Sequence, residues 1–423
     1  MINSAPLARF GPLGDGRLLR PIYADYAFAN LTNTVEYLLS GDVRPPLLPP
    51  DCFAGGYPRP QKVVLILIDA FGWEAWQAHW QRFRATRRIV ASGTLTPISA
   101  LFPSTTAASV STLHLGVLPS AHALYEWNVY IPAFGEVIQS LAFSPLGRHA
   151  QDACLQRGYD PQRLLAVHAT AHQRLAQHGV RSLVFAHRSY AMSAYNRMVC
   201  AGANITSHHS LAEGLVQLKE ALLATPGKAW FNFYWAGIDT TAHYYGPGGG
   251  HHDAEIASFW HTFDAVFADV ASRDTLYLFA ADHGHVHVRA EDTFFLNERL
   301  PGLAQCLAVS PTGRCIYPNG SPRDVFLHVA GERRADVLVR LTQALADMAL
   351  VMPVDAAIAE GLFGTAPVGE ELRARLGDIV ILPYPGYFIW WREPRVIGNT
   401  FHGHHGGLAR EELITALGAI DAL

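Results

Sequence analysis

The chain has few charged residues and no block of them. Only 16% of its 423 residues are Asp, Glu, Lys or Arg, and the formal net charge is −4. Without a basic patch, the sequence gives no support for nucleic-acid binding. Its longest apolar runs, such as "VVLILI" and "ALADMALVMPV", are too short for the ~20 residues that a membrane-spanning helix needs. Half of the residues are hydrophobic, which is typical of a folded protein with a large core.

Cysteine is also scarce. The five cysteines are scattered and form no CxxC pair, so neither a zinc ribbon nor a disulfide framework is predicted. This usage fits a reduced, intracellular setting. The N-terminus, "MINSAPLARFGPLGDG", has no apolar stretch behind a basic start, so no signal peptide is expected. We therefore expect a cytoplasmic protein.

Short apolar runs alternate with helical patterns along much of the chain. The main runs cover 62–70, 229–239 and 275–284, with helical patterns at 210–224 and 253–272. This alternation predicts an α/β fold with a doubly wound, mostly parallel sheet. Other candidate strands cover 182–186, 324–330, 378–383 and 387–391.

Two regions do not show this alternation of strands and helices. Residues 1–60 are rich in Pro and Gly around a helix predicted at about 29–40, and are interpreted as an N-terminal arm. Residues 291–375 contain the turn-rich stretch "SPTGRCIYPNGSP" and a helix predicted at about 333–350. We interpret them as a lobe inserted into a core formed by 61–290 and 376–423.

Each of the three main apolar runs ends in aspartate: Asp69, Asp239 and Asp282. In open parallel sheets the ligand crevice lies at the carboxyl ends of the strands. Three carboxylates there would repel one another, and a multivalent cation removes that cost. Each Asp alone could simply cap the next helix. Three of them, each with His or Gly close by, favour a metal site.

Histidine is plentiful, with 21 residues, and several lie near these aspartates. His243 follows Asp239 by four positions, His283 is adjacent to Asp282, and a pair at 404–405 precedes a Gly-Gly turn. Mixed Asp and His ligands suit Zn²⁺ or Mn²⁺ better than Ca²⁺ or Mg²⁺. The ligands suffice for two divalent ions, for which we expect zinc, with manganese as the alternative.

The densest run of hydroxyl residues is "TLTPISALFPSTTAASVSTLHLG", at 94–116. Two-metal sites stabilise the attacking and leaving oxygens of phosphoryl displacement, so a nearby hydroxyl is a candidate nucleophile. A helix that begins here would also offer backbone N–H groups to an anion. The alternative is that Ser and Thr merely cap this helix.

Five motifs occur in the order seen in the alkaline phosphatase superfamily. They are "LILIDAFGW", "FPSTTAASVSTLHLGVLPSAHAL", "GIDTTAHYYGP", "ADHGH" and "GHHGGL". The chain most resembles the type I phosphodiesterase/nucleotide pyrophosphatase family, from about residue 62 to the C-terminus. The family's nucleophilic Thr lies ten residues before a Gly that matches Gly116, which indicates Thr106. The family's Phe-Pro-Asn after the Thr is replaced by Ala-Ala-Ser here, so Thr105 stays an alternative.

The resemblance also implies the metal ligands. One ion would be held by Asp239, His243 and His405, and the other by Asp69, Thr106, Asp282 and His283. Asn128 would hold a phosphate oxygen. His402 and His404 are candidates for contacts with the substrate or with the ligands, and His285 is expected to lie nearby without binding metal.

The implied activity is hydrolysis of phosphodiester or pyrophosphate bonds in small, nucleotide-like substrates, through a covalent phospho-threonine. Monoesterases of the superfamily commonly hold phosphate with an Arg near the nucleophile, and no Arg lies between Arg88 and Arg148. This favours a diester, although Arg314 of the predicted lobe could reach the site. The aromatic segment 187–204 either stacks on a nucleoside or packs as an ordinary loop. A phosphomonoesterase and an inactive, metal-stabilised binding protein remain alternatives, and no oligomeric state is predicted.

Overall fold

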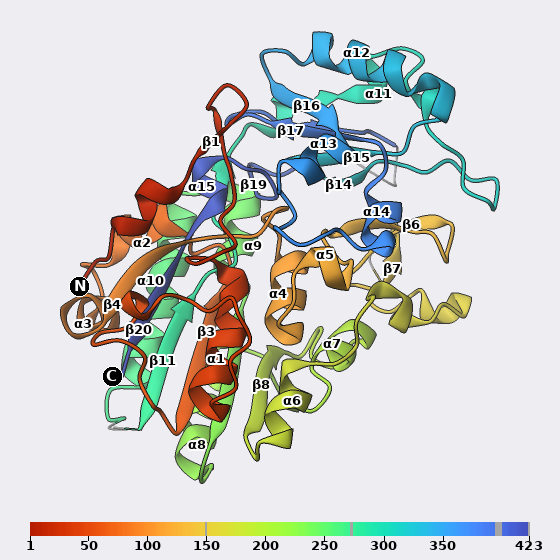
Figure 1. Ribbon diagram of the computed structural model, residues 1–423. Helices are drawn as coiled ribbons and strands as arrows, with labels where there is room; N and C mark the ends of the chain where they lie inside the picture. Colours follow the sequence, from red (N-terminus) through yellow and green to blue (C-terminus); the bar gives the residue numbers. More distant parts are fainter. Residues whose placement is uncertain (149, 271–273, 394–399, 422–423) are drawn as a thin grey trace.

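A seven-stranded sheet forms the lower part of the molecule in Figure 1. The computed structural model describes residues 1–148, 150–270, 274–393 and 400–421. All neighbouring strands of this sheet are parallel except β20, which is antiparallel to both of its neighbours. The mostly parallel α/β sheet predicted from the sequence is therefore confirmed. The strand order is β4 (Thr94–Ser99), β20 (Ile414–Ile420), β11 (Thr275–Ala280), β3 (Lys62–Ile68), β10 (Ala229–Trp235), β8 (Arg181–His187) and β9 (Asn204–His208).

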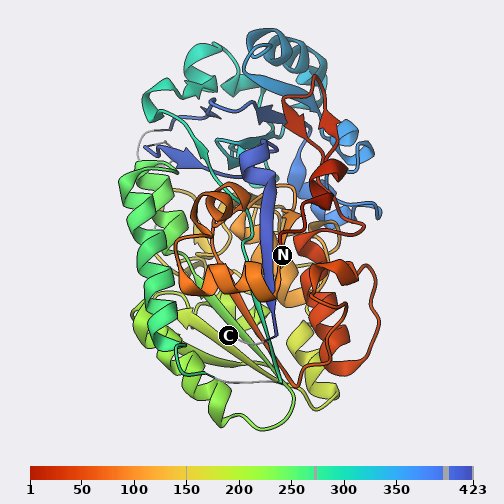
Figure 2. The same ribbon diagram turned by 90° about the vertical axis from the view of Figure 1, so that its left-hand side faces the viewer.

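Helices cover both faces of this sheet, which explains why its strands are continuously apolar. Along β3, alternate side chains enter two different hydrophobic clusters, as the two-residue period of a strand requires. One face packs against α2 (Trp73–His79), α3 (Arg84–Ser92), α8 (Leu211–Ala224) and α10 (Gly250–Val266). The other packs against α1 (Leu31–Ser40), α4 (Thr106–Leu115) and α6 (Ala171–Gln177). Figure 2 shows α1 and α10 on opposite sides of the strands.

Most predicted elements of the core have counterparts. The four predicted strands at 62–70, 182–186, 229–239 and 275–284 are β3, β8, β10 and β11, and the helix at 29–40 contains α1. The helices predicted at 210–224 and 253–272 are α8 and α10. The second of these ends at Val266, and its predicted last two residues lie outside the described part of the chain.

A second seven-stranded sheet, entirely antiparallel, lies beyond the carboxyl ends of the parallel strands (Figure 1). It draws strands from 128–145 as well as from 319–383, whereas the predicted lobe covers 291–375 alone. The division into arm, core and lobe therefore stays a prediction. The strand order is β16 (Ala349–Pro353), β17 (Ile379–Pro383), β15 (Asp324–Leu327), β14 (Asn319–Ser321), β5 (Asn128–Ile131), β6 (Glu136–Gln139) and β7 (Ser144–Pro145).

Two predicted elements of this region are shorter than expected. The helix predicted at 333–350 is α12 (Arg334–Ala344), and the chain then enters β16 at Ala349. The run at 387–391 gives only the two-residue strand β18 (Ile389–Trp390), which pairs with β13 (Phe294–Phe295). In both cases the apolar sequence pattern is longer than the element, because packing against other segments ends the helix or strand before the pattern ends. Among the described residues, no helix combines the length and apolar character that crossing a membrane requires.

A buried ion pair joins the two sheets. Arg323, next to β15, donates to both carboxylate oxygens of Glu412 at 2.9 Å, and neither side chain is exposed. Glu412 lies in α15 (Arg410–Leu413), immediately before β20. It also accepts hydrogen bonds from the backbone N–H groups of Gly407 and Ala409, each at 3.1 Å. The pair therefore fixes the loop that carries His405.

Candidate metal centre and nucleophile

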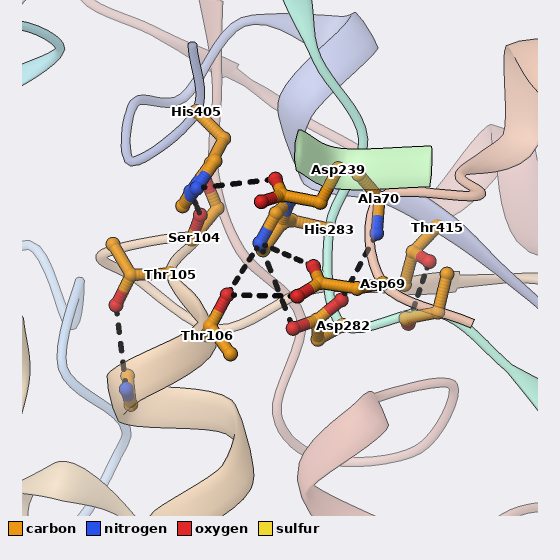
Figure 3. Close-up of polar contacts among 12 residues, drawn as sticks. Asp69, Ala70, Ser104, Thr105, Thr106, Asp239, Asp282, His283, His405 and Thr415 are labelled. Carbon is orange, nitrogen blue, oxygen red and sulfur yellow. Dashed lines mark hydrogen bonds and ion pairs between the residues drawn. The ribbon is translucent and has the colours of Figure 1, made fainter. Parts of the chain in front are cut away.

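The three predicted aspartates meet at the ends of adjacent strands (Figure 3). Strands β10, β3 and β11 are neighbours in the sheet. Asp69 follows β3 directly, and Asp282 comes two residues after β11. Strand β10 ends earlier than expected, so that Asp239 lies in the first turn of α9 (Gly237–Tyr245). All three side chains nevertheless reach the crevice that a parallel sheet forms at its carboxyl edge.

One cluster consists of Asp69, Asp282 and His283, all buried. His283 Nε2 lies 3.3 Å from Asp69 Oδ1 and 3.6 Å from Asp282 Oδ2. Neither of these two carboxylate oxygens accepts a hydrogen bond. Because buried polar atoms are normally satisfied, two such oxygens facing one imidazole fit the donor set of a cation.

A second cluster surrounds one oxygen of Asp239. Three imidazole nitrogens point at Oδ1: Nε2 of His285 at 2.8 Å, of His243 at 3.5 Å and of His405 at 3.6 Å. The four potential ligand atoms lie within 4.8 Å of one another. The structure thus brings together Asp239, His243 and His405, and adds His285.

Three of these histidines bond a backbone carbonyl through Nδ1. Such a bond fixes the orientation of the ring and leaves Nε2 for a metal, as in most metal-binding histidines. The carbonyl partners are Gly403 for His243 at 2.9 Å, Ser104 for His405 at 2.9 Å and Gly284 for His283 at 3.1 Å.

The electrostatics of the clusters fit a divalent cation. Burial, followed by the charges of Asp239 and Asp282, raises the pKa of Asp69 well above its ordinary value. Burial would also raise the pKa of Asp239, but the imidazoles, first among them His243, hold that pKa below its usual range. Burial and the neighbouring rings lower the pKa of His405, which keeps it neutral. Buried carboxylates beside imidazoles form a donor set that matches metals such as zinc.

Thr106, the first residue of α4, directs its hydroxyl at the first cluster (Figure 3). Its Oγ1 lies 3.4 Å from Asp69 Oδ2 and 3.2 Å from His283 Nε2. Thr106 is only half-buried, whereas Asp69 and His283 are fully buried. The hydroxyl is therefore both close to the potential ligands and open to an incoming molecule.

Thr105, the alternative nucleophile, has a different role. Its hydroxyl donates to the backbone carbonyl of Tyr125 at 3.0 Å and accepts from the backbone N–H of Ala108 at 3.3 Å. Thr105 is thus the N-cap of α4 and is 2% exposed. The capping interpretation fits Thr105, and the interpretation as nucleophile fits Thr106.

Neither Asn128, predicted to hold a phosphate oxygen, nor Arg314, a candidate for reaching the site from the predicted lobe, contacts the clusters in the part of the chain that the structure describes. Asn128, in β5, donates from its amide to the carbonyl of Gly320 at 2.9 Å. Arg314 is exposed and pairs with Glu136 at 3.3 Å. The role of Asn128 stays a prediction.

The other histidines of the C-terminal motif surround the second cluster. The buried ring of His404 packs edge-on against His243, with 4.7 Å between their centroids. The backbone N–H of His402 donates to the carbonyl of His243 at 2.8 Å, while its side chain is exposed. Both residues therefore support the position of His243.

Two tyrosines that sequence reasoning did not connect to the site lie beside it. The Tyr234 hydroxyl, near the end of β10, donates to Asp69 Oδ2. Tyr190, in the segment 187–204, packs edge-on against Tyr234 with 6.0 Å between the ring centroids. The segment thus has an aromatic ring one contact away from Asp69. The position of Tyr234 one residue before the strand end was the available signal.

Comparison with known protein families agrees with the resemblance seen in the sequence. Residues 63–408 match the model of the family described as type I phosphodiesterase/nucleotide pyrophosphatase. No curated protein sequence matches this chain significantly.

Solved structures with a similar fold include murine ectonucleotide pyrophosphatase/phosphodiesterase 5, in an inactive form in complex with AMP. It has 15% identity and a TM-score of 0.62, over 85% of this chain and 87% of that one. Another is phosphonoacetate hydrolase from Sinorhizobium meliloti 1021 in complex with phosphonoacetate, with 16% identity and a TM-score of 0.59, over 86% and 91% of the two chains. Identities this low show a shared fold. The family model covers most of the chain, and the chain therefore belongs to the type I phosphodiesterase/nucleotide pyrophosphatase family.

Proposed function

We propose that the protein is a metal-dependent hydrolase of phosphodiester or pyrophosphate bonds that acts through a covalent phospho-threonine. The observation that carries the proposal is the position of Thr106. Its hydroxyl is at the N-terminus of α4, next to Asp69 and His283 and open to an incoming molecule.

Two divalent ions, zinc before manganese, would be held by the two clusters. Asp69, Asp282 and His283 would hold one together with Thr106, and Asp239, His243 and His405 would hold the other. When bound, the ions would lower the pKa of a coordinated hydroxyl and offset negative charge on the reacting phosphate.

Thr106 would supply the nucleophile. Its oxygen would lose the hydroxyl proton to solvent and attack phosphorus, so that a threonine–phosphate ester forms as the bond to the leaving oxygen breaks and that oxygen takes a proton from solvent. Water would then cleave this ester, release the phosphate product and restore the hydroxyl. The N-terminus of α4 would favour the anionic phosphate because its free N–H groups and its dipole attract negative charge.

A small nucleotide-like diester is the substrate class that we favour. The murine structural neighbour was captured with AMP. Here the ring of Tyr234 lies beside Asp69 and that of Tyr190 packs against Tyr234, and such rings are suitable for contacts with a nucleobase. Arg314 is paired with Glu136, which weakens the case for it as the phosphate-binding arginine of a monoesterase.

Hydrolysis of bis(p-nitrophenyl) phosphate and of p-nitrophenyl phosphate tests the proposal. We expect faster turnover of the diester, dependent on added Zn²⁺ or Mn²⁺ and lost in Thr106→Ala. A preference for the monoester would favour a phosphomonoesterase. Bound metal without turnover of either compound, or of a dinucleoside pyrophosphate, would favour a binding protein.

A further inference from the structure

His285 stands apart from the residues that the family resemblance assigns to metal. We propose that His285 is a fourth protein ligand, through Nε2, of the ion held by Asp239, His243 and His405. This inference rests on the proposed metal-dependent function and concerns the composition of one of its two ion sites.

The geometry around Asp239 Oδ1 supports four ligands. Ligands at ~2.0–2.1 Å from a tetrahedral zinc lie about 3.3 Å from one another. The distances from Oδ1 to Nε2 are 2.8 Å for His285, 3.5 Å for His243 and 3.6 Å for His405. These values bracket the tetrahedral separation, so one ion could be reached by all four side chains with small adjustments.

The surroundings of His285 also support its assignment as a metal ligand. Its side chain is 2% exposed, and its ring centroid lies 4.7 Å from that of His243 and 5.2 Å from that of His405. Three imidazoles gathered around one carboxylate oxygen cannot all be satisfied by that oxygen. A cation at the point where their Nε2 atoms converge would accept all of them.

The alternative is a hydrogen bond. The 2.8 Å separation would also suit an Nε2–H donor that holds Asp239 in place without touching the ion, and Nδ1 of His285 is buried without a hydrogen bond. In that case His285 would be a positioning residue. Two substitutions of His285 distinguish a metal ligand from a positioning residue: one that keeps a hydrogen-bond donor and one that supplies a different metal ligand.

A fourth ligand would have a functional consequence. Catalytic zinc sites usually have three protein ligands and an open position, whereas four-ligand sites are closed. The ion at Asp239 would then be held more tightly than its neighbour, and a substrate oxygen could approach it only through a fifth position. The two ions would differ in affinity and exchange rate.

Cobalt loading of the full-length His285→Cys protein provides the direct test. A thiolate bound to Co²⁺ gives a near-ultraviolet charge-transfer band, and no cysteine belongs to either cluster. We expect a band beyond that of wild type. His287→Cys is the matched control, because His287 lines the same cavity of about 470 Å³ as His285 but is exposed and outside the cluster. It should give no added band.

Metal affinity measured by chelator competition supplies the second arm. His285→Gln keeps an N–H donor, and we expect it to weaken the binding of one ion by more than the ~10–100-fold that loss of a residue orienting a ligand costs, and to leave the affinity for the other ion unchanged. Unaltered affinity for both ions in His285→Gln, with no added band in His285→Cys, would overturn the inference and leave the proposed function intact. A wild-type protein that binds no metal would overturn both.

Discussion

The hydroxyl of Thr106 lies 3.2 Å from Nε2 of His283, although the two residues are 177 positions apart in the chain. Thr106 begins the helix that follows the edge strand β4, whereas His283 follows β11 near the middle of the sheet. The fold brings them together because both chain segments leave the sheet at its carboxyl edge. Under the proposed function, this pair marks the point where the phosphate of the substrate would bind.

Substitution of the two adjacent threonines should have separate effects. We expect Thr106→Ala to reduce kcat on a phosphodiester on the order of 10³-fold or more, as loss of a nucleophile does, and to leave folding stability nearly unchanged. Thr105→Ala removes the N-cap of α4 and should cost about 1 kcal/mol of unfolding free energy with much of kcat retained. Kinetics and urea unfolding of both variants measure this. The reverse pattern would assign the nucleophile to Thr105.

The residues of the candidate metal site could largely be predicted from the sequence, because each lies at a point that the local sequence pattern marks. A buried parallel strand is a continuous apolar run, so the residue at which it ends can be recognised in the sequence. An acidic residue at the carboxyl end of such a strand is expected to face the crevice at that edge of the sheet. Asp69, Asp239 and Asp282 were found in this way. The order of the five motifs then indicated the fold and the family.

The rest depended on contacts between distant segments. Strand β20 contains small residues, and β4 contains Pro97, which is tolerated because β4 lies at the sheet edge. Neither has the pattern of a buried strand. The second sheet combines 128–145 with 319–383, a pairing that no local pattern encodes. The contacts of His285 with Asp239 and of Tyr234 with Asp69 likewise exist only after folding.

Removal of the Asp69 charge should stabilise the metal-free protein. Burial and two nearby carboxylates raise the pKa of Asp69, so above its ordinary pKa the metal-free protein loses stability as pH rises, by about 1.4 kcal/mol per unit until the raised pKa is passed. We expect Asp69→Asn to show a higher unfolding free energy than wild type near pH 7 with chelator present. With Zn²⁺ added, wild type should gain more stability than the variant.

Urea unfolding with and without Zn²⁺ measures both effects of Asp69→Asn. The exposed Asp347 offers a control, and Asp347→Asn should behave as wild type under both conditions. Equal stabilisation of wild type and Asp69→Asn by Zn²⁺ would count against Asp69 as a ligand.

Loss of the buried ion pair between the sheets should be costly. Arg323→Met leaves the Glu412 carboxylate buried without its partner, and breaking such a pair typically costs about 3–5 kcal/mol. The double variant Arg323→Met/Glu412→Leu removes both charges and should recover part of this loss. Unfolding free energies of wild type, Arg323→Met, Glu412→Leu and the double variant give the coupling between the residues. A single variant as stable as wild type would mean that the pair does not join the sheets energetically.

Acid should destabilise the protein partly through His122, which ends α5 (Pro119–His122). Burial, and then the charge of Arg375, lowers the pKa of His122 from 6.5 to about 3. The neutral ring is held between the Thr112 hydroxyl, 3.0 Å from Nε2, and the backbone N–H of Leu124, 3.2 Å from Nδ1. Since the unfolded chain binds the proton more readily, the stability contributed by neutral His122 is complete above about pH 6.5 and is lost as pH falls toward 3.

Each pH unit in this window should remove about 1.4 kcal/mol of unfolding free energy through His122. We expect His122→Gln, which cannot titrate, to be less stable than wild type at neutral pH but to lose stability less steeply between about pH 6.5 and 5. Urea unfolding with chelator present measures both slopes without a contribution from metal release. His251→Gln, at an exposed histidine, should keep the wild-type slope. If His122→Gln also kept the wild-type slope, His122 would not be the group through which acid lowers the unfolding free energy.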